Sequence, residues 1–300
     1  MANPYFSIIL PTYNRAQLIA GAVESVVRQD FENWELIVVD DGSTDDTRAR
    51  LAAFTEHDDR IRYMYQENAE RSTARNNGIA QARGTYICFL DSDDYYLDNY
   101  LSSFKAFITA LKEPVAMFFC NISFQHGAEI RKFKTPEFAN YNATEFFLLN
   151  GIGTPRVCLH RSITATYLFD PSISIGEDTE LWIRIAGAYP YHYLNKYLYV
   201  AVEHSGRSVS RMNAGAAIRN LKTKKHLLRH LGRQHISQSV RKTILHNAWF
   251  SLAQSYYEKQ AFWGVFHASA NSCVYQPAKR WKEKLYMLYA ILKNKFFVAR

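Results

Sequence analysis

Four carboxylates lie within eight residues in the stretch FLDSDDYYLD: Asp91, Asp93, Asp94 and Asp98. They follow a run of residues that favours a β-strand. Because like charges at short distance destabilise one another, such a cluster needs a bound cation or free access to water. Mg²⁺ and Mn²⁺ prefer oxygen ligands and commonly take one or two protein carboxylates, with phosphate oxygens and water completing six positions. The stretch therefore indicates either a divalent-cation site or a solvated turn in which Asp98 caps the next helix.

Two further carboxylates, Glu177 and Asp178, follow Gly176 and precede the sequence TELWIRIA. The apolar residues of that sequence would anchor a helix in the core. A general base must stay within hydrogen-bond reach of the hydroxyl that it deprotonates, so an anchored carboxylate suits this role. Charge matching to the N-terminal end of the helix dipole explains the pair equally well, and the spacing alone leaves both interpretations open.

Strands and helices that could position these groups alternate in the first third of the chain. We expect strands at 5–10, 34–40, 61–66 and 85–90. Helices are expected at 15–29, from just after the turn at Gly42 to about residue 54, and at 71–82. Asn14 would cap the first helix, and Ser43 or Thr44 the second. This order implies parallel strands with right-handed crossovers, hence an open α/β sheet.

Polar clusters follow three of these strands. They are PTYN after the first strand, DDGS after the second and DSDD after the fourth. Ligands of such sheets bind at the carboxyl ends of the strands, so the three clusters should face one crevice. There, Asp40 and Asp41 could contact a nucleobase or ribose or cap the following helix. Tyr13 could stack on a base or be an ordinary half-buried tyrosine, and Arg71 and Arg75 could reach phosphates or be solvated on their helix.

The remainder of the chain differs in pattern and in charge. We expect a helix near 98–111, strands at 115–124, 129–134, 156–161, 191–194 and 197–204, and helices beyond 213. Residues 1–218 contain 20 Lys and Arg residues and 26 Asp and Glu residues. Residues 219–300 contain 16 Lys and Arg residues but only 2 Asp and Glu residues, so the C-terminal region is strongly basic. The basic, aromatic-rich helices of this second region are typical of a membrane-surface element or of a helical subdomain with a solvated basic face. Nucleic-acid binding is disfavoured, because no known binding motif accompanies the basic residues.

Composition limits the class of protein. With 300 residues, 48% of them hydrophobic, the chain can bury a full core. The cysteines are scattered without metal-ligand spacing and are expected to be buried thiols in a reducing compartment; they are Cys88, Cys120, Cys158 and Cys273. The N-terminal sequence shows no secretory pattern, and no uncharged apolar run is long enough to span a bilayer. We therefore expect a cytoplasmic protein, peripheral on the inner face of the cell membrane if the basic region binds lipid.

Four motifs in this order, SIILPTYN, VVDDGSTDDT, RNNGIAQARGTYICFLDSDDYY and GEDTELWIRIA, closely resemble those of the family 2 glycosyltransferases. The resemblance runs from about residue 6 to residue 211. It implies the GT-A fold, which is a Rossmann-like, mixed and mostly parallel open sheet flanked by helices. We expect a catalytic domain at 1–212 and a C-terminal helical region at 213–300 that serves as a membrane-surface or acceptor-side element.

The resemblance also implies roles for individual residues. The donor-binding set would be Pro11, Thr12 and Tyr13 around the base, Asp41 on uracil or ribose, Arg71 on the pyrophosphate or base, and Asp91 and Ser92. Asp93 would ligate a divalent cation, Mn²⁺ or Mg²⁺, with Asp91 and His204 as further metal contacts. Asp178 would be the catalytic base, with Glu177 beside it contacting the acceptor or the sugar.

The implied activity is inverting transfer of a sugar from a nucleotide-diphosphate donor, by default UDP, to a hydroxyl of a glycan or lipid-linked acceptor in cell-surface polysaccharide synthesis. One alternative is a nucleotidyltransferase that makes the activated sugar, although the loop after the first strand lacks the expected glycines. A second is a non-catalytic, membrane-associated scaffold that binds nucleotide-sugars. A phosphatase with an aspartate nucleophile is disfavoured. In such enzymes the acidic motif follows the first strand of the sheet, whereas in this chain it follows the fourth.

Overall fold

The computed structural model describes residues 3–136, 141–204, 214–230, 236–276 and 278–297. Its internal contacts divide the chain into two compact units. The first comprises Met1–Ala143 and Asn150–His204, and the second comprises Thr144–Leu149 and Ser205–Arg300. The predicted boundary between 212 and 213 falls outside the described residues, so it remains a prediction.

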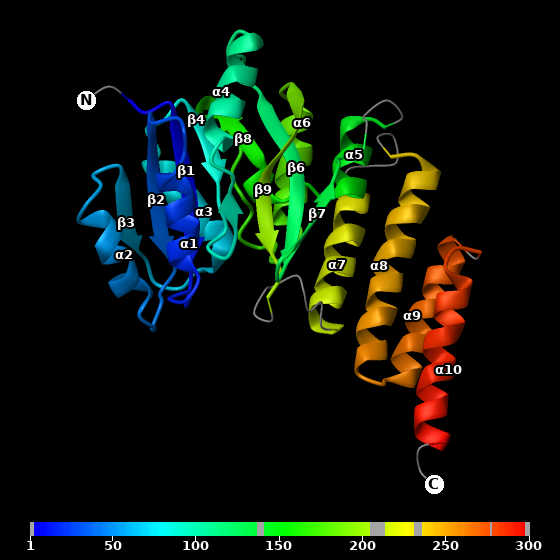
Figure 1. The fold of residues 1–300 in the computed structure, drawn as a ribbon. Coiled ribbons are helices and arrows are strands. Elements are labelled where there is room, and N and C mark those ends of the chain that lie inside the picture. The colour runs from blue at the N-terminus through cyan, green and yellow to red at the C-terminus, as the bar shows by residue number, and fades with distance from the viewer. Residues whose placement is uncertain (1–2, 137–140, 205–213, 231–235, 277, 298–300) are drawn as a thin grey trace. The chain divides into compact units, whose positions relative to one another are not determined.

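A nine-stranded sheet, counted over the described residues, forms the centre of the first unit (Figure 1). The strand order is β3-β2-β1-β4-β8-β6-β9-β5, and β7 pairs with β6 outside this path. The strands are β1 (Phe6–Thr12), β2 (Trp34–Asp40), β3 (Ile61–Tyr65), β4 (Tyr86–Phe89), β5 (Tyr95–Tyr96), β6 (Met117–His126), β7 (Glu129–Phe133), β8 (Val157–His160) and β9 (Tyr191–Val202). Strands β1 to β4 are parallel, and β8 is antiparallel to both of its neighbours, β4 and β6. The predicted mixed, mostly parallel α/β sheet is confirmed.

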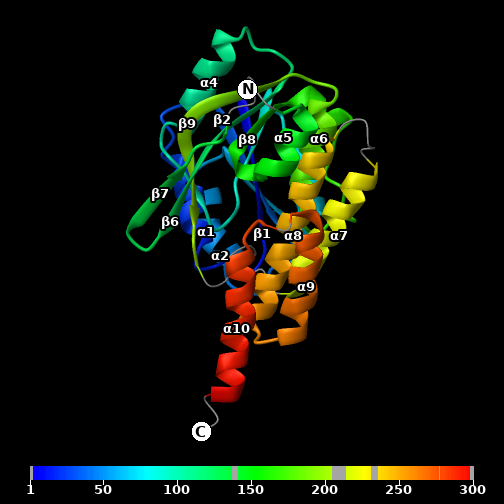
Figure 2. The same cartoon turned by 90° about the vertical axis from the view of Figure 1, so that its right-hand side faces the viewer.

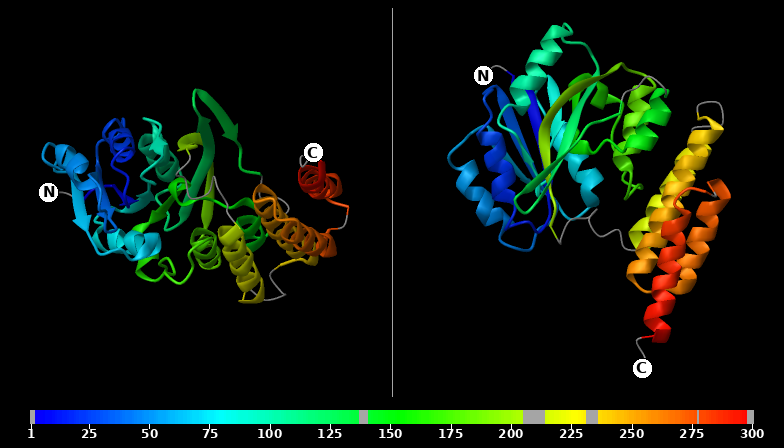
Figure 3. Two further views of the ribbon diagram at one scale, coloured as in Figure 1. Left: turned by 90° about the horizontal axis from the view of Figure 1, so that it is seen from below. Right: turned by 45° about the vertical axis from the view of Figure 1, so that its right-hand side comes forward.

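Helices cover both faces of this sheet, as the left view of Figure 3 shows. They are α1 (Ile19–Val27), α2 (Thr47–Thr55), α3 (Glu70–Gln81), α4 (Tyr100–Ala110) and α6 (Glu177–Ala186). Side chains alternate across a strand, so Ile8 of β1 lies in the core shared with α1 and α4, whereas Ile9 faces α3. This double burial explains why the central strands are apolar at successive positions rather than at alternate ones.

Helix α3 lies unusually close to the sheet because its sequence places a glycine at the contact. A Cβ atom on Gly78 would lie 2.5 Å from Cγ2 of Ile9 and 3.1 Å from Cγ2 of Val39. Helix α3 can therefore rest directly on β1 and β2, and this contact sets the position of its other side chains at the carboxyl edge of the sheet.

Several sequence-based boundaries are wrong. Asn14 does not cap α1, since that helix begins at Ile19, and neither Ser43 nor Thr44 caps α2, since that helix begins at Thr47. The strands expected at 191–194 and 197–204 are one strand, β9, which continues across a register shift in its pairing with β6. Strand β5 and helix α5 (Ala143–Asn150) were not predicted.

The second unit is helical, as predicted, over its described residues. It contains α7 (Ala214–His230), α8 (Gln238–Glu258), α9 (Phe262–Tyr275) and α10 (Trp281–Phe297). Figures 1 and 2 show α8, α9 and α10 side by side, and their buried residues form one hydrophobic cluster with those of α7. Among the described residues, no helix is both long and apolar enough to cross a membrane.

Candidate active site

The loops that follow β1 and β2 are bound to each other at the carboxyl edge of the sheet. Asn14, with φ at 50°, accepts a hydrogen bond on Oδ1 from the amide of Thr44 at 2.8 Å. Its own amide donates to Oγ of Ser43 at 2.9 Å. Asn tolerates this left-handed conformation, so Asn14 serves as a connector between loops rather than as the predicted helix cap.

The two carboxylates after β2 have different environments. Asp40 is buried and accepts from the amide of Ser43 at 2.9 Å and from the hydroxyl of Tyr63 at 2.7 Å, so it holds the loop. Asp41 accepts on Oδ1 from Nε2 of Gln66 at 2.7 Å and from the amide of Ala69 at 2.8 Å. Oδ2 of Asp41 accepts no hydrogen bond from the described residues. The predicted donor contact Asp41 therefore has one oxygen held by the protein and one that a ligand could use.

The three predicted base-binding residues lie at the end of β1. Pro11 is half-buried and pairs with Val39, and Tyr13 is 48% exposed immediately after the strand. Thr12 is buried, and its Oγ1 has no hydrogen-bond partner among the described residues. Buried hydroxyls are nearly always paired in native proteins, so an orphaned one at the ligand edge of the sheet is consistent with a ligand that supplies the partner.

Arg75 on α3 joins the two acidic motifs. Its Nη2 lies 3.0 Å from Oδ1 of Asp91, and its Nη1 lies 3.1 Å from Oε1 of Glu177. The Arg75 side chain is only 4% exposed and its guanidinium carbon lies 5.3 Å from the centre of the Phe169 ring. The sequence places these carboxylates 86 residues apart, and one buried cation brings them together.

The charge of Arg75 is secured by its surroundings. Burial alone would lower the pKa of Arg75, but Asp91 and Glu177, and beyond them Asp178, outweigh it and raise the pKa above its ordinary value. The effect of Asp178 places this carboxylate in the electrostatic environment of the same guanidinium. The predicted base Asp178 and the first aspartate after β4, Asp91, therefore both lie near Arg75.

Helix α6, which carries Glu177 and Asp178, and the loop before it are held by contacts with α3 and with the segment at Ile152. Nδ2 of Asn76 donates to the carbonyl of Phe169 at 2.9 Å, and the amide of Phe169 donates back to Oδ1 of Asn76 at 3.0 Å. The Trp182 indole donates to the carbonyl of Ile152 at 2.8 Å. Gly176 begins the helix at φ 82°, a conformation that favours glycine, and turns the chain so that both carboxylates stand in the first helical turn.

Within this turn the two carboxylates differ in their contacts. Glu177 is buried against Arg75, and its Oε1 also lies 4.0 Å from Nε of the predicted donor contact Arg71, which is 41% exposed. Asp178 is half-buried and accepts on Oδ1 from the amide of Thr179 at 2.5 Å. Asp178 is therefore more accessible to an acceptor hydroxyl than Glu177.

Asp93 meets His204 on the far side of the acidic stretch. Oδ2 of Asp93 lies 3.0 Å from Nε2 of His204 and 3.7 Å from Nη2 of Arg15. The next carboxylate, Asp94, accepts from the Tyr199 hydroxyl and so binds the loop to β9. The predicted pair Asp93 and His204 is thus brought together, although the sequence separates the two residues by more than a hundred positions.

The side chains that could coordinate a divalent cation are Asp93, His204 and Asp91. Among the described residues, no group of three or more His, Cys, Asp or Glu side chains is arranged to hold a metal ion. Asp93, His204 and the one-third-exposed Asp91 offer oxygen and nitrogen ligands from two places in the chain. Mg²⁺ and Mn²⁺ accept ligands of these types where phosphate oxygens and water supply the remaining positions, and the metal site remains a prediction. Ser92, predicted to bind the donor, is buried between the two aspartates.

The site residues that the family resemblance implies include neither Arg75 nor Arg15. The sequence predicts Arg75 only as a possible phosphate contact beside Arg71, because the two lie one helical turn apart. Their patterns are alike, but in the structure Asp91, Glu177 and Phe169 surround Arg75, whereas Arg71 is 41% exposed. Arg15 carried no distinguishing signal in the sequence.

Comparison with known proteins identifies the family of this chain. The model of glycosyl transferase family 2 matches residues 7–167, which is more than half of the chain. A similar curated protein is the UDP-Glc:alpha-D-GlcNAc-diphosphoundecaprenol beta-1,3-glucosyltransferase WfgD of Escherichia coli, 35% identical over 182 residues, 60% of this chain and 68% of WfgD. The match spans only 26% to 30% of three similar Rickettsia glycosyltransferases.

Solved structures of the same fold are also similar. S. aureus TarS 1-349 in complex with UDP-GlcNAc has a TM-score of 0.59 at 18% identity, over 97% of this chain and 91% of that one. The mannosyltransferase PcManGT from Pyrobaculum calidifontis in complex with GDP-Man and Mn²⁺ has a TM-score of 0.53 at 19% identity, over 100% and 89%. These likenesses confirm the GT-A fold. Given the family match, the ordered motifs and the fold, the chain belongs to glycosyl transferase family 2.

Proposed function

We propose that this protein transfers a sugar from a nucleoside-diphosphate donor, UDP by default, to a hydroxyl of a glycan or lipid-linked acceptor, with inversion at the anomeric carbon. The observation that carries the proposal is the contact of Arg75 with both Asp91 and Glu177, which brings the acidic loop after β4 to the start of α6. The acceptor class is supported by WfgD, whose name specifies a diphosphoundecaprenol-linked acceptor. Cell-surface polysaccharide synthesis is the corresponding process.

The donor would lie along the carboxyl edge of the sheet. Tyr13 would stack on the base, Thr12 would pair its orphaned hydroxyl with the nucleotide, and Asp41 would use its second oxygen on uracil or ribose. Arg71 is exposed enough to reach the diphosphate. Asp93, with Asp91 and His204, would hold Mn²⁺ or Mg²⁺, which when bound supplies positive charge to stabilise the departing nucleoside diphosphate.

Asp178 would act as the general base. It takes the proton of the acceptor hydroxyl, whose oxygen forms a bond to the anomeric carbon while the bond to the diphosphate oxygen breaks. The leaving nucleoside diphosphate keeps the electron pair of that bond. Attack from the face opposite the leaving group inverts the configuration, and a single displacement needs no protein nucleophile. Glu177, held by Arg75, would contact the acceptor or the sugar.

The test separates binding from chemistry. Donor binding is measured as the thermal shift produced by UDP-glucose with and without Mn²⁺, since a ligand of the native state raises apparent stability. Transfer is measured with an undecaprenyl-diphosphate-linked sugar. We expect Asp178→Asn to abolish transfer while keeping the donor shift. Asp59→Asn, the same change at the amino end of β3, is the matched control and should alter neither. Loss of both properties in Asp178→Asn would contradict its role as base.

The same measurements address the alternatives. A nucleotidyltransferase would release diphosphate from UTP and a sugar phosphate, which the proposed enzyme should not do. A non-catalytic scaffold would show the donor shift without transfer or donor hydrolysis in the wild type. For the enzyme we expect turnover that Asp93→Ala abolishes, together with loss of the Mn²⁺-dependent part of the shift.

We also propose that the second unit contacts the membrane that holds a lipid-linked acceptor. Helix α9 carries no Asp, Glu, Lys or Arg, and its Trp263, Phe266 and Val274 are 76%, 51% and 73% exposed at helical spacing. An apolar face within a basic region suits an anionic lipid surface. Flotation with vesicles of anionic lipid should retain the wild type and release Trp263→Ser/Phe266→Ser. Equal flotation of both would exclude this face. The cytoplasmic location is consistent with this arrangement and remains a prediction.

A further inference from the structure

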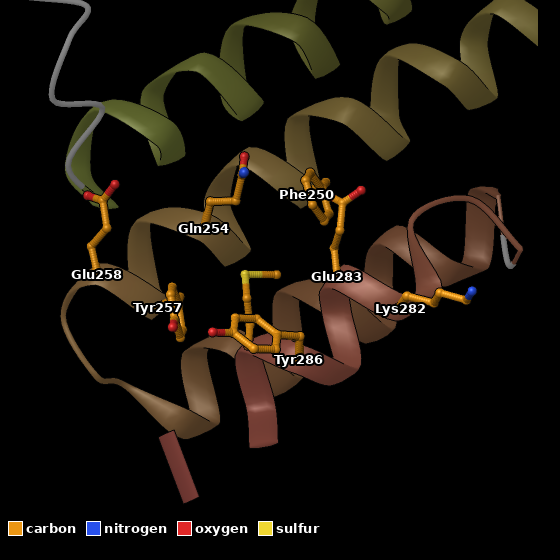
Figure 4. A pocket seen from close by; sticks show the side chains of 8 residues that line it. Phe250, Gln254, Tyr257, Glu258, Lys282, Glu283 and Tyr286 are labelled. Carbon is orange, nitrogen blue, oxygen red and sulfur yellow. The ribbon is translucent and has the colours of Figure 1, made fainter. Parts of the chain in front are cut away.

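A pocket lies between α8 and α10 within the second unit (Figure 4). Its volume is about 520 Å³, inside the range of roughly 300–1,000 Å³ that small-molecule sites occupy. Eight residues line it: Phe250, Gln254, Tyr257, Glu258, Lys282, Glu283, Tyr286 and Met287. The pocket thus combines aromatic rings with a few polar side chains, which is the composition of sites that bind and orient an organic ligand.

The charge of this pocket departs from that of the sequence around it. Residues 219–300 contain 16 basic side chains and only two acidic ones, Glu258 and Glu283, and both acidic ones line the pocket. Glu283 lies 3.9 Å from Arg280, whose guanidinium carbon stands 4.6 Å from the centre of the Phe250 ring. The protein's own cation, Arg280, therefore stands next to two of the residues at one end of the pocket.

The other end keeps its polar groups unpaired. Among the described residues, no side-chain hydrogen bond or ion pair is made by Gln254, Glu258, or the hydroxyls of Tyr257 and Tyr286. Tyr286 is 64% exposed, and Figure 4 shows its hydroxyl pointing toward the side on which Tyr257 lies. Two aromatic rings with free hydroxyls, an amide and a carboxylate are thus available together.

The chemistry of these groups selects a class of ligand. An anion would meet two carboxylates and a single lysine, Lys282. An acyl chain would have to desolvate Glu258 and the tyrosine hydroxyls without giving them partners. A small cation would have to enter a strongly basic region, in which Arg280 already covers Phe250. A neutral polyhydroxyl ring avoids these costs, because its C–H face packs on aromatic rings while its hydroxyls donate to the carboxylate and amide oxygens.

We propose that the α8–α10 pocket is a carbohydrate-binding site that holds a sugar unit of the acceptor glycan other than the unit that reacts. The proposal rests on the proposed function in that the glycan is taken to be the acceptor. Tyr286 and Tyr257 supply the stacking surface, Glu258 and Gln254 accept and donate hydrogen bonds, and Phe250 with Met287 forms the apolar floor. Such a site would tether a growing chain and make longer acceptors better substrates than short ones.

The test uses the full chain without donor, so that it reports on the pocket and not on transfer. Wild-type protein is applied to an array of neutral and acidic bacterial oligosaccharides, and the affinity for the strongest binder is measured by calorimetry. We expect Tyr286→Ala and Glu258→Gln each to weaken binding by about tenfold or more, as loss of a charged hydrogen bond or a stacking ring predicts. Both residues are exposed, so folding should be kept, which the thermal unfolding midpoint checks.

The matched control is Tyr289→Ala, which removes the same residue type from the same helix at nearly the same exposure, 62%, but outside the pocket. It should change the affinity by less than about twofold. No binding by the wild type, equal affinities of Tyr286→Ala and Tyr289→Ala, or Tyr286-dependent binding of laurate instead of sugars would each overturn the proposal. None of these results changes the donor shift or transfer to a short acceptor, so failure of the pocket and failure of the proposed function can be told apart.

Discussion

Replacing Arg75 by Met should be among the most destabilising single changes at the carboxyl edge of the sheet. Arg75 contacts Asp91 at 3.0 Å and Glu177 at 3.1 Å, and Met keeps much of the aliphatic stem while removing the charge. Glu177 is 5% exposed, so its carboxylate would be left buried without its cation. Asp91, about one-third exposed, would be partly rehydrated.

The magnitude follows from this difference in burial. Removing one partner of a buried ion pair costs about 3–5 kcal/mol, because the remaining charge is uncompensated. A partly exposed pair contributes less than about 1 kcal/mol. We therefore expect Arg75→Met to lower the free energy of unfolding by about 3–5 kcal/mol, nearly all of it through Glu177. That is a large part of the roughly 5–15 kcal/mol by which a typical domain is stable.

Denaturant unfolding at pH 7 measures the loss in the free energy of unfolding. Two further variants test whether the loss comes from the buried carboxylate of Glu177. Arg71→Met removes the same charge one helical turn earlier, where the side chain is 41% exposed and 4.0 Å from Glu177, and should cost less than about 1 kcal/mol. Arg75→Met/Glu177→Gln removes the orphaned charge and should recover at least about 1 kcal/mol of the loss. Equal costs for the two arginine variants, or strict additivity in the double variant, would refute the argument.

Two other changes test the scaffold that positions the site. Burial alone would raise the pKa of Glu35, but hydrogen bonds from Ser7 and Arg83 outweigh it and hold the pKa below its ordinary value of 4.5. The stability that this carboxylate contributes is present above that value and lost as the pH falls through the lower pKa of the folded state. Glu35→Gln should therefore cost about 2–3 kcal/mol at pH 7 and clearly less at the acid end of a denaturation series, whereas a pH-independent loss would contradict the assignment. Gly78→Ala should cost about 1–3 kcal/mol in the same assay, because its Cβ would meet Ile9 at 2.5 Å; a neutral effect would mean that α3 shifts freely on the sheet.

The parallel half of the sheet was predictable because its signals are local. Short apolar runs such as those of β1 and β2 alternate with amphipathic segments, and strands buried on both faces read as continuous apolar stretches. Right-handed crossovers then leave few topologies. The order of the antiparallel strands was not accessible in this way. Strand β8 inserts between β4 and β6, and that neighbourhood depends on contacts between residues distant in sequence.

The start of α1 shows how tertiary contacts override local propensity. Asn14 is a good cap by type, yet its side chain binds the loop after β2 instead. The amide of Arg15 then donates to Oγ1 of Thr47 at 2.9 Å, which fixes the next residues outside the helix. The helix begins only at Ile19, once these contacts end. The sequence contains all the residues of this connection, but it does not indicate which of them contact one another.

The site residues also differ in whether the sequence could identify them. Residues within an ordered motif could be assigned by resemblance, because motif order and spacing are visible in the sequence. Arg75 and Arg71 could not be separated, since both lie on α3 one turn apart. Their difference, 4% against 41% exposure, arises from where the start of α6 docks on α3. A charged residue acquires its role from burial, and burial is set by the packing of elements that are far apart in the chain.

Burial and pairing also explain how the chain tolerates its crowded carboxylates. Asp91 is paired with Arg75, and Asp94 accepts hydrogen bonds from the Tyr199 hydroxyl and from the amide of Val202 at 2.8 Å. These two carboxylates therefore point toward separate partners on different elements. These separate contacts reduce the mutual repulsion of the two carboxylates.

Asp93 is the member of the cluster whose partners a ligand could share. It meets His204 at 3.0 Å and Arg15 at 3.7 Å, and no buried guanidinium among the described residues holds it as Arg75 holds Asp91. A cation that binds Asp93 must therefore compete with two side chains that are themselves partly exposed, at 21% and 26%. Because His204 and Arg15 remain partly in contact with water, replacing their contacts with Asp93 by a bound cation costs little free energy. The carboxylates of the acidic stretch thus differ in how firmly the protein holds them, and the contacts of Asp93 are the ones that the proposed cation would have to replace.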